Sequence, residues 1–354
     1  MKLKTDTDQT TSPSSIVWIL LAGGGLVLII GGMRAASEIV NLLLIAYVIT
    51  LIFTPFFLWL RNKKIPAFLA IIFILLTLLV GILFLGWFVG ISVYQFEAKL
   101  PEYEAQLEAA LARVISPESL LPFIEQILTQ PSPDFLSIGS LANSVLKVIP
   151  SVLSGLSSFS SQVLMIMFIV FFGLLESTNL AKRISKGLES DPQFFSELQE
   201  INLGVRKYIL IKTWTGLLAA GANTLVLMVL GVDFALLWGL LSFLLNYIPS
   251  VGFIIALIPP FILALIQFSL KEALIVLTAY IVINTLTDNI ISPRVMGKGL
   301  DLSPLAVFIS LVFWAWVLGL VGAIMAVPLL LIMKMILGRF YDTRWLAVAI
   351  SGEN

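Results

Sequence analysis

The charged residues of this chain are gathered into clusters, and long stretches between the clusters carry no charge. No Asp, Glu, Lys or Arg occurs at 234–270 or at 302–333. About 20 apolar residues cross a bilayer, so uncharged runs of this length are typical of membrane spans. Only 12% of the residues are charged and the mean hydropathy is +1.04, whereas soluble domains are about a quarter charged. The sequence therefore predicts an all-α polytopic transmembrane protein.

The sequence lacks two residue types on which many functional sites depend. It has no Cys and no His, which excludes disulfides, thiolate metal sites, Ser-His dyads and histidine proton relays. The formal net charge is zero, so bulk charge predicts no nucleic-acid partner. No GxxxxGK(S/T) motif occurs, and ATP-driven transport is therefore unsupported. We expect no enzyme activity, no cofactor and no metal site.

Lys and Arg follow several of the apolar segments, and such residues mark cytoplasmic loops. The basic residues that carry this inference are Arg61, Lys63, Lys64, Lys182, Arg183, Lys186, Arg206, Lys207, Lys212, Arg294, Lys298, Lys334, Arg339 and Arg344. The predicted order is a cytoplasmic polar tail at 1–15, three transmembrane helices at 16–91, an extracytoplasmic amphipathic segment at 92–150, a fourth transmembrane helix at 151–175, a cytoplasmic amphipathic helix at 176–208, a membrane core at 209–337 and a cytoplasmic tail at 338–354.

Two polar segments have apolar residues at steps of three and four, which predicts amphipathic helices. At 191–207, Asp191 followed by Pro192 fits an N-cap and a first-turn proline. The segment 94–114 either packs on its own neighbours outside the membrane or lies on the lipid surface. Its apolar side consists of Leu100, Tyr103, Leu107, Leu111 and Val114.

The basic residues also determine where the uncharged runs must turn. If Arg206 and Arg294 are cytoplasmic, the run 234–270 begins and ends on the outer side, so it must reverse at NYIPSVG (246–252). By the same reasoning, 302–333 begins and ends on the inner side and turns near LGLVG (318–322). An arm such as 234–248 makes about 22 Å of helix, against a hydrocarbon core of about 30 Å. Both runs are therefore expected to form re-entrant or short helical hairpins.

A helix followed by a hairpin occurs twice within 209–337, and the two copies have opposite predicted orientations. Such inverted repeats are the usual build of secondary transporters, whose substrate lies near the midplane where broken helices meet. Irregular backbone at that depth must be buried in protein or line water. We therefore interpret 209–337 as a transport core. The alternative interpretation of NYIPSVG is a plain turn, in which Pro sets φ and Gly relaxes the chain.

Polar residues within the transport core are the candidate translocation site. Asp288 is the only acid between Glu272 and Asp301, and a carboxylate inside the membrane is a functional candidate by default. Alternatively, Asp288 ends a helix at the cytoplasmic interface and pairs with Arg294. The candidate translocation residues are Asn246, Tyr247, Pro249, Asn284, Asp288 and Asn289. The candidate hinge or close-packing residues are Gly252, Pro293, Gly297, Gly319 and Gly322.

Several stretches of the C-terminal half resemble the autoinducer-2 exporter family of membrane proteins. They are YIPSVG (247–252) with Pro259 and Pro260, DNIISPRVMGKGLDLSP (288–304) and LGLVGAIMAVPLLLIMKMI (318–336). The stretch 232–252, with YILIKT (208–213) and SLVFWAWVLG (310–319), looks especially like the tqs-type branch of that family. The resemblance is specific over about 208–337, and over 1–200 it is one of layout.

This resemblance implies a homo-oligomer in the bacterial cytoplasmic (inner) membrane, and pentamers are described in the family. It also implies export of the quorum-sensing signal autoinducer-2 or a related small polar solute, driven by the membrane potential or an ion gradient. Two alternatives stay open. One is a sodium/proton antiporter that uses Asp288, since some family members are implicated in such exchange. The other is a membrane scaffold without flux.

Overall fold

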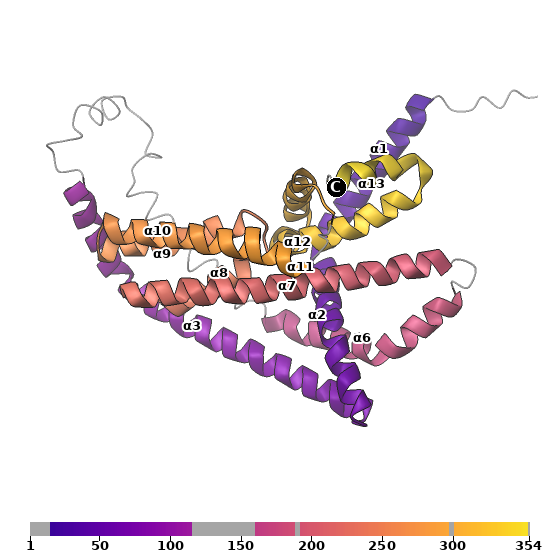
Figure 1. Ribbon diagram of the computed structural model, residues 1–354, viewed down its shortest axis with the longest axis horizontal. Coiled ribbons are helices and arrows are strands. Elements are labelled where there is room, and N and C mark those ends of the chain that lie inside the picture. Colours follow the sequence, from indigo (N-terminus) through magenta and orange to yellow (C-terminus); the bar gives the residue numbers. More distant parts are fainter. Residues whose placement is uncertain (1–14, 115–159, 188–191, 297–300, 353–354) are drawn as a thin grey trace, which may run out of the picture.

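The computed structural model describes residues 15–114, 160–187, 192–296 and 301–352, and these residues form helices and no strand (Figure 1). The elements are α1 (Ser15–Ala35), α2 (Ser37–Asn62), α3 (Ala67–Val114), α6 (Ser160–Gly187), α7 (Pro192–Leu230), α8 (Ala235–Leu245), α9 (Gly252–Gln267), α10 (Leu270–Asn284), the π-helix η2 (Thr285–Ile291), α11 (Ser292–Met296), α12 (Pro304–Arg339), the 3₁₀-helix η3 (Tyr341–Thr343) and α13 (Arg344–Ile350). The predicted all-α class is confirmed.

Several of these helices are long and apolar enough to cross a membrane. Among the described residues, the candidate spans are Ser37–Asn62, Ala67–Tyr103, Ser196–Leu230, Leu270–Val295 and Pro304–Arg339. Large apolar side chains stand exposed along them, such as Leu83 on α3 and Val229 on α7. An exposed apolar helix surface of this extent is stable in lipid and unfavourable in water. The prediction of a polytopic helical membrane protein is therefore confirmed.

Two helices continue through a change of polarity at which the sequence suggests a boundary. The predicted amphipathic helix at 94–114 is the second half of α3, which is 48 residues long. The amphipathic segment at 191–207 and the predicted span at 209–232 are joined in the same way within α7. Of the predicted span at 151–175, residues 151–159 lie outside the described part of the chain, and α6 begins at Ser160.

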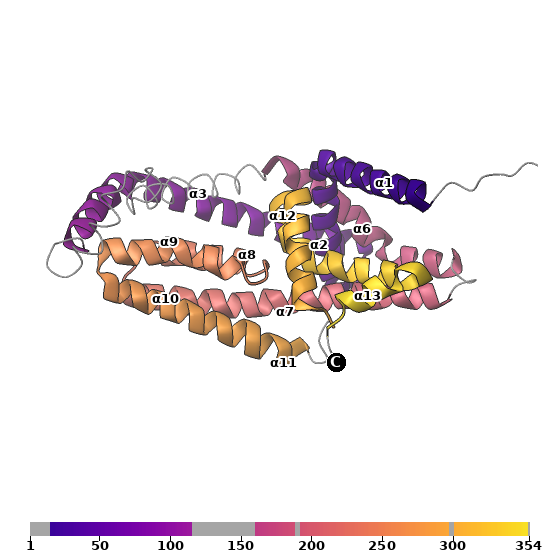
Figure 2. The same ribbon diagram turned by 90° about the horizontal axis from the view of Figure 1, so that it is seen from above.

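The α8–α9 hairpin lies between α3 on one side and α7 and α10 on the other (Figure 2). Its main core centres on Trp238 of α8, whose side chain is fully buried. The ring of Phe96 from α3 meets Trp238 edge-on, with 6.1 Å between ring centroids. The hairpin is therefore held between α3 and α7, which are both longer than its own arms. A second core, separate from the hairpin, joins α2, α3 and α6 through residues such as Phe57, Ile71 and Leu174.

Both uncharged runs reverse direction at the predicted places. The first run consists of α8, with 11 residues, and α9, with 16, joined by a turn at 246–251. The second run is interrupted at Gly319, where φ is 67° and ψ is −144° within α12. The Ser310 hydroxyl donates to the carbonyl of Ala326 at 2.8 Å, so the two arms of α12 lie side by side across this break. Glycine is needed at position 319 because L residues rarely adopt that backbone conformation.

Candidate functional site

The tip of the α8–α9 hairpin is fastened to α7 by two side chains that the sequence singles out. Asn246 is buried, and its Nδ2 donates to the backbone carbonyl of Lys212 at 3.2 Å. The Tyr247 hydroxyl lies 2.7 Å from the Thr213 hydroxyl. Pro249 is in the turn itself, where its carbonyl accepts from Val251 N–H at 2.6 Å. The tip therefore has a fixed position against the middle of α7.

Two of the predicted close-packing glycines lie where the hairpin arms touch backbone to backbone. A Cβ on Gly252 would be 1.8 Å from the Leu245 carbonyl oxygen, and one on Gly322 would be 2.0 Å from that of Trp314. Neither site has room for a side chain. The second tip also has an external contact, since Asn41 Nδ2 of α2 donates to the Leu318 carbonyl at 3.1 Å.

A buried ion pair joins α7 to the π-helix η2 beside the first hairpin tip. Lys212 Nζ is 2.8 Å from Asp288 Oδ1, and the two side chains are only 9% and 21% exposed. The sequence uses Lys212 as a marker of the cytoplasmic side, and the structure adds a contact that the sequence does not predict: Lys212 lies within α7, against an acid 76 residues away. The alternative pairing of Asp288 with Arg294 is not found, and Arg294 is exposed on α11. In this pair each charge has the opposite charge as its partner, and removing either one would leave the other partly buried and uncompensated.

The segment that carries Asp288 is a π-helix, in which the Ser292 N–H donates to the carbonyl of Thr287. Single π-turns inside longer helices occur frequently at functional sites. Thr287 is buried and donates to the Ile283 carbonyl at 2.8 Å. By contrast, Asn289 is exposed. Of the two candidate translocation residues on η2, Asp288 thus faces α7, and Asn289 does not.

The remaining candidates lie at the edges of this region. Asn284 closes α10, and its carbonyl accepts from the Thr287 hydroxyl at 3.1 Å. Pro293 is exposed on α11. Gly297 lies outside the described residues. None of these makes a described contact with the ion pair.

Tyr208 is a residue of this site that the sequence prediction missed. It precedes Lys212 by one helical turn, and its side chain is 3% exposed. Its hydroxyl has no hydrogen-bond partner in the part of the chain that the structure describes, although Asp288 and Tyr247 act on it electrostatically. Buried hydroxyls almost always have a partner. The sequence did contain a signal for this part of α7. Lys212 is an ionisable residue inside a predicted span, which makes it and its helical neighbours functional candidates.

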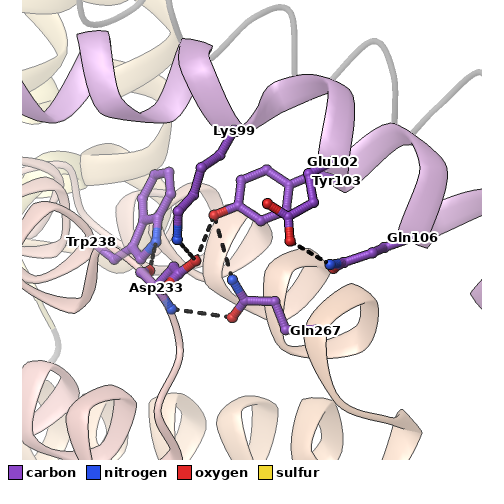
Figure 3. Close-up of polar contacts among 7 residues, drawn as sticks. All are labelled: Lys99, Glu102, Tyr103, Gln106, Asp233, Trp238 and Gln267. Carbon is purple, nitrogen blue, oxygen red and sulfur yellow. Dashed lines mark hydrogen bonds and ion pairs between the residues drawn. The ribbon is translucent and has the colours of Figure 1, made fainter.

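A second polar cluster lies at the open end of the α8–α9 hairpin, beyond the end of α7 (Figure 3). Asp233 Oδ2 is 2.7 Å from Lys99 Nζ and accepts from the Tyr103 hydroxyl at 2.7 Å. Gln267, the last residue of α9, accepts from the Asp233 N–H at 3.1 Å, and Trp238 Nε1 donates to the Asp233 carbonyl at 3.0 Å. These contacts join both ends of the hairpin to the outer part of α3.

The same cluster determines the charge of Asp233. Burial alone would raise the pKa of this carboxyl, but the hydrogen bonds from Lys99 and Tyr103 and the positive charge of Lys99 outweigh burial and lower the pKa. Asp233 therefore stays ionised at neutral pH. Its carboxylate is the centre to which the hairpin base and α3 are both bound.

The base of the second hairpin has a similar acid–lysine contact. Lys334 Nζ is 2.8 Å from Asp301 Oδ2 and 2.6 Å from the Asp301 carbonyl oxygen. The hydrogen bond from Lys334 lowers the pKa of Asp301. The Ser303 N–H donates to the Ile350 carbonyl at 2.8 Å, which adds the C-terminal helix α13 to this base. Among the described residues, no group of three or more acids is placed to hold a metal ion.

The fold and this site can be compared with known proteins. The model of the AI-2E family transporters matches residues 24–342. The chain belongs to the AI-2E transporter family. It is 31% identical to the AI-2 transport protein TqsA of Escherichia coli K12 over 336 residues, covering 95% of this chain and 96% of that protein. The predicted family is confirmed.

Two further relatives of this chain show similar levels of identity. The putative transport protein YhhT of Escherichia coli K12 is 30% identical over 320 residues, which is 89% of each chain. A putative transport protein of Haemophilus influenzae is 31% identical over 322 residues, covering 90% of this chain and 91% of that protein. All three relatives are named as transport proteins, which points to a membrane transport protein and not to an enzyme.

Proposed function

We propose that this protein is a secondary transporter that exports a small polar solute, similar to autoinducer-2, across the bacterial cytoplasmic membrane. Family membership and the name of TqsA support the solute class. In this proposal the N- and C-termini are cytoplasmic, and the two helix-plus-hairpin units form the inverted repeat of the transport core. The clustered basic residues support this orientation.

The observation that carries the proposal is the Lys212–Asp288 pair beside the broken-helix tip. Ionisable groups inside a membrane are costly and mark substrate or ion pathways. Asn246 of the hairpin tip bonds to the backbone carbonyl of the same Lys212, and Tyr247 bonds to the neighbouring Thr213. The unpartnered Tyr208 hydroxyl adds a donor that a polar solute can use. A solute held here would contact α7, the hairpin tip and η2 together.

The other predicted residues have supporting roles in this proposal. Pro249 shapes the tip, and Asn284 and Asn289 flank the π-helix on its two sides. The hinge or close-packing residues keep the arms and the linker in register; they are Gly252, Pro293, Gly297, Gly319 and Gly322. The resemblance to the exporter family adds a homo-oligomer, with a pentamer as the expected size, which mass photometry of the purified protein can measure.

The test is solute flux in proteoliposomes that contain the purified protein. We expect saturable transport of radiolabelled autoinducer-2 by the wild type, and a strong loss in Asp288→Asn because the ion pair with Lys212 is broken. The matched control is Asp342→Asn, which changes an exposed acid in η3. Equal loss in both variants would contradict a site at Asp288. Absence of any saturable flux in the wild type would favour the scaffold alternative.

A sodium/proton antiporter is the second candidate, and the observation that favours it is the partly buried carboxylate of Asp288 on the π-helix η2. In antiport, a sodium ion or proton would have to displace the Lys212 ammonium, which lies 2.8 Å from Asp288 Oδ1. Antiport predicts that a pH gradient drives sodium-22 uptake into the same proteoliposomes. Uptake that is unchanged in Asp288→Asn would rule out this role for Asp288.

The depth of the first hairpin has a separate test. The chain contains no Cys, so a single Ser250→Cys variant reports only on the hairpin tip. Ser250 is exposed on the turn, so we expect slow labelling by a membrane-impermeant maleimide only because the proposed re-entrant tip lies within the membrane. Tyr341→Cys, at a position that is 92% exposed, is the control for fast labelling. Rapid labelling of Ser250→Cys from the cytoplasm alone would instead indicate an ordinary loop between full spans.

A further inference from the structure

Lys212 and Asp288 form a charge pair that is complete without any ion from solution. Their charged atoms are 2.8 Å apart, and the lysine is the more deeply buried of the two, at 9% exposed. Within the described ranges, neither residue makes an ion pair with any third group. The pair therefore has no net charge, and its positive charge belongs to a side chain of the protein and not to an ion from solution.

This arrangement differs from a carboxylate that lies alone in a membrane. A lone buried carboxylate is strongly disfavoured, so it takes up a proton or is neutralised by a cation. Transport through such a site depends on the ion that neutralises it. Here the cation is a side chain of the protein, and it stays with the site after a solute leaves.

The polar side chains described above on α7, the hairpin tip and η2 carry no charge, and Arg294 on the adjoining α11 is exposed and makes no ion pair with Asp288 among the described residues. α7 contributes the neutral hydroxyls of Tyr208 and Thr213, and the hairpin tip contributes Asn246 and the Tyr247 hydroxyl. The π-helix contributes Thr287, whose hydroxyl is already bonded to its own helix. Of these groups only the two tyrosines titrate, and they are neutral at physiological pH. Among the described residues, Lys212 is thus the one cation that forms an ion pair with Asp288.

We propose that Lys212 is the resident counter-cation of Asp288, and that it makes transport through this site independent of sodium ions and protons. The inference rests on the proposed function and deepens it, because it states what drives the flux. The solute then moves down its own electrochemical gradient. Removing the lysine charge exposes Asp288, which must then recruit a proton or sodium ion before the site can function.

The experiment compares the wild type with Lys212→Met, Lys212→Arg and the double variant Lys212→Met/Asp288→Asn. The first readout needs no transport: it is the melting temperature of the full-length protein in sodium chloride and in N-methylglucamine chloride. A bound cation stabilises the folded state by mass action. We expect a sodium-dependent rise in Lys212→Met only, because only that variant has an uncompensated carboxylate. The wild type, Lys212→Arg and the double variant should melt equally in the two salts.

The second readout is autoinducer-2 flux in proteoliposomes without ion gradients. Wild-type flux should be the same in sodium and N-methylglucamine buffers and flat between pH 6 and 8. Flux through Lys212→Met should instead be higher in sodium than in N-methylglucamine buffer, because the carboxylate of Asp288 then has to recruit a cation from solution. Lys212→Arg should keep the flat profile, since it retains the charge.

Two results would overturn the inference. One is a wild-type melting temperature that rises in sodium as much as that of Lys212→Met. The other is wild-type flux that stops without a sodium or proton gradient. If neither the wild type nor any of the variants transports autoinducer-2, the proposed function fails. The melting temperatures would still decide the role of Lys212. If Lys212→Met does not fold, the double variant and Lys212→Arg show whether the lost charge is the cause.

Discussion

Replacing Gly252 by alanine should disrupt the α8–α9 hairpin more than any other single methyl group added to a glycine of α7 to α9. The new Cβ would lie 1.8 Å from the Leu245 carbonyl oxygen and 2.7 Å from its carbon. Ordinary carbon–oxygen contacts are about 3.3 Å or longer, so the two arms must separate by about 1.5 Å. The obstacle is backbone in the last turn of α8, which cannot rotate away. Overpacking of this kind costs about 1–3 kcal/mol or more, and we expect about 3 kcal/mol.

Two other glycines provide graded controls. At Gly239 the nearest atom to a new Cβ is the Thr224 hydroxyl oxygen at 1.8 Å, and a side chain can change rotamer, so Gly239→Ala should cost less. At Gly221 on α7 no atom lies within 4 Å. Gly221→Ala should stabilise the helix by up to about 1 kcal/mol through its better helix propensity.

The measurement is thermal unfolding of the purified protein in one detergent, followed by intrinsic fluorescence. The expected order of melting temperature places Gly221→Ala at or above the wild type, Gly239→Ala below it and Gly252→Ala lowest. A loss of about 3 kcal/mol corresponds to several degrees in a chain of this size. If Gly252→Ala and Gly221→Ala both have the melting temperature of the wild type, the backbone contact at Gly252 does not hold the hairpin together.

Three further predictions concern the two hairpins. Gly319→Ala should lower stability by about 1–3 kcal/mol from backbone strain alone, because φ is 67° and nothing lies within 4 Å of a new Cβ; an unchanged melting temperature would exclude that strain. Asn246→Leu removes the hydrogen bond from Asn246 to the Lys212 carbonyl, which keeps its contact with the Thr215 hydroxyl, and should cost about 0.5–1.5 kcal/mol, which a melting curve would show. The pKa of Asp233 is lowered from 3.8, so its stabilising effect is present above pH 3.8 and is lost as pH falls through the folded-state value. The melting temperature of the wild type should therefore fall further than that of Asp233→Asn below about pH 4, and equal acid sensitivity would contradict the role of the Lys99 contact.

The sequence was sufficient to predict both hairpins, because the signals involved are local. The uncharged runs and their flanking charges fix the number of reversals, and NYIPSVG and LGLVG contain the residues that a reversal needs. The structure turns at 246–251 and at Gly319. Helix boundaries were less predictable, since a change from apolar to polar residues does not end a helix unless its backbone hydrogen bonds also end. For this reason α3 and α7 extend through such changes.

The site was predicted only in part, because its main contact depends on tertiary structure. Asp288 could be selected as an intramembrane acid, but Lys212 is 76 residues away and was interpreted only as a marker of membrane side. The π-helix also has no sequence signature here, since it depends on backbone hydrogen bonds shifted by one residue, such as that from Ser292 to Thr287. In this π-helix Asp288 faces α7, whereas the next residue, Asn289, is exposed.

The glycine contacts at both hairpin tips restrict how this molecule can move. Because Gly252 and Gly322 press directly on the opposite arm, each hairpin behaves as a stiff lever and cannot flex at its tip. Any swing must pivot at the base, where Phe234 and Asp301 have positive φ values of 59° and 47°. Each pivot is braced by an acid–lysine contact, Lys99 to Asp233 and Lys334 to Asp301. Those contacts are partly exposed, so the ionic strength of the surrounding solution can change the stiffness of each pivot.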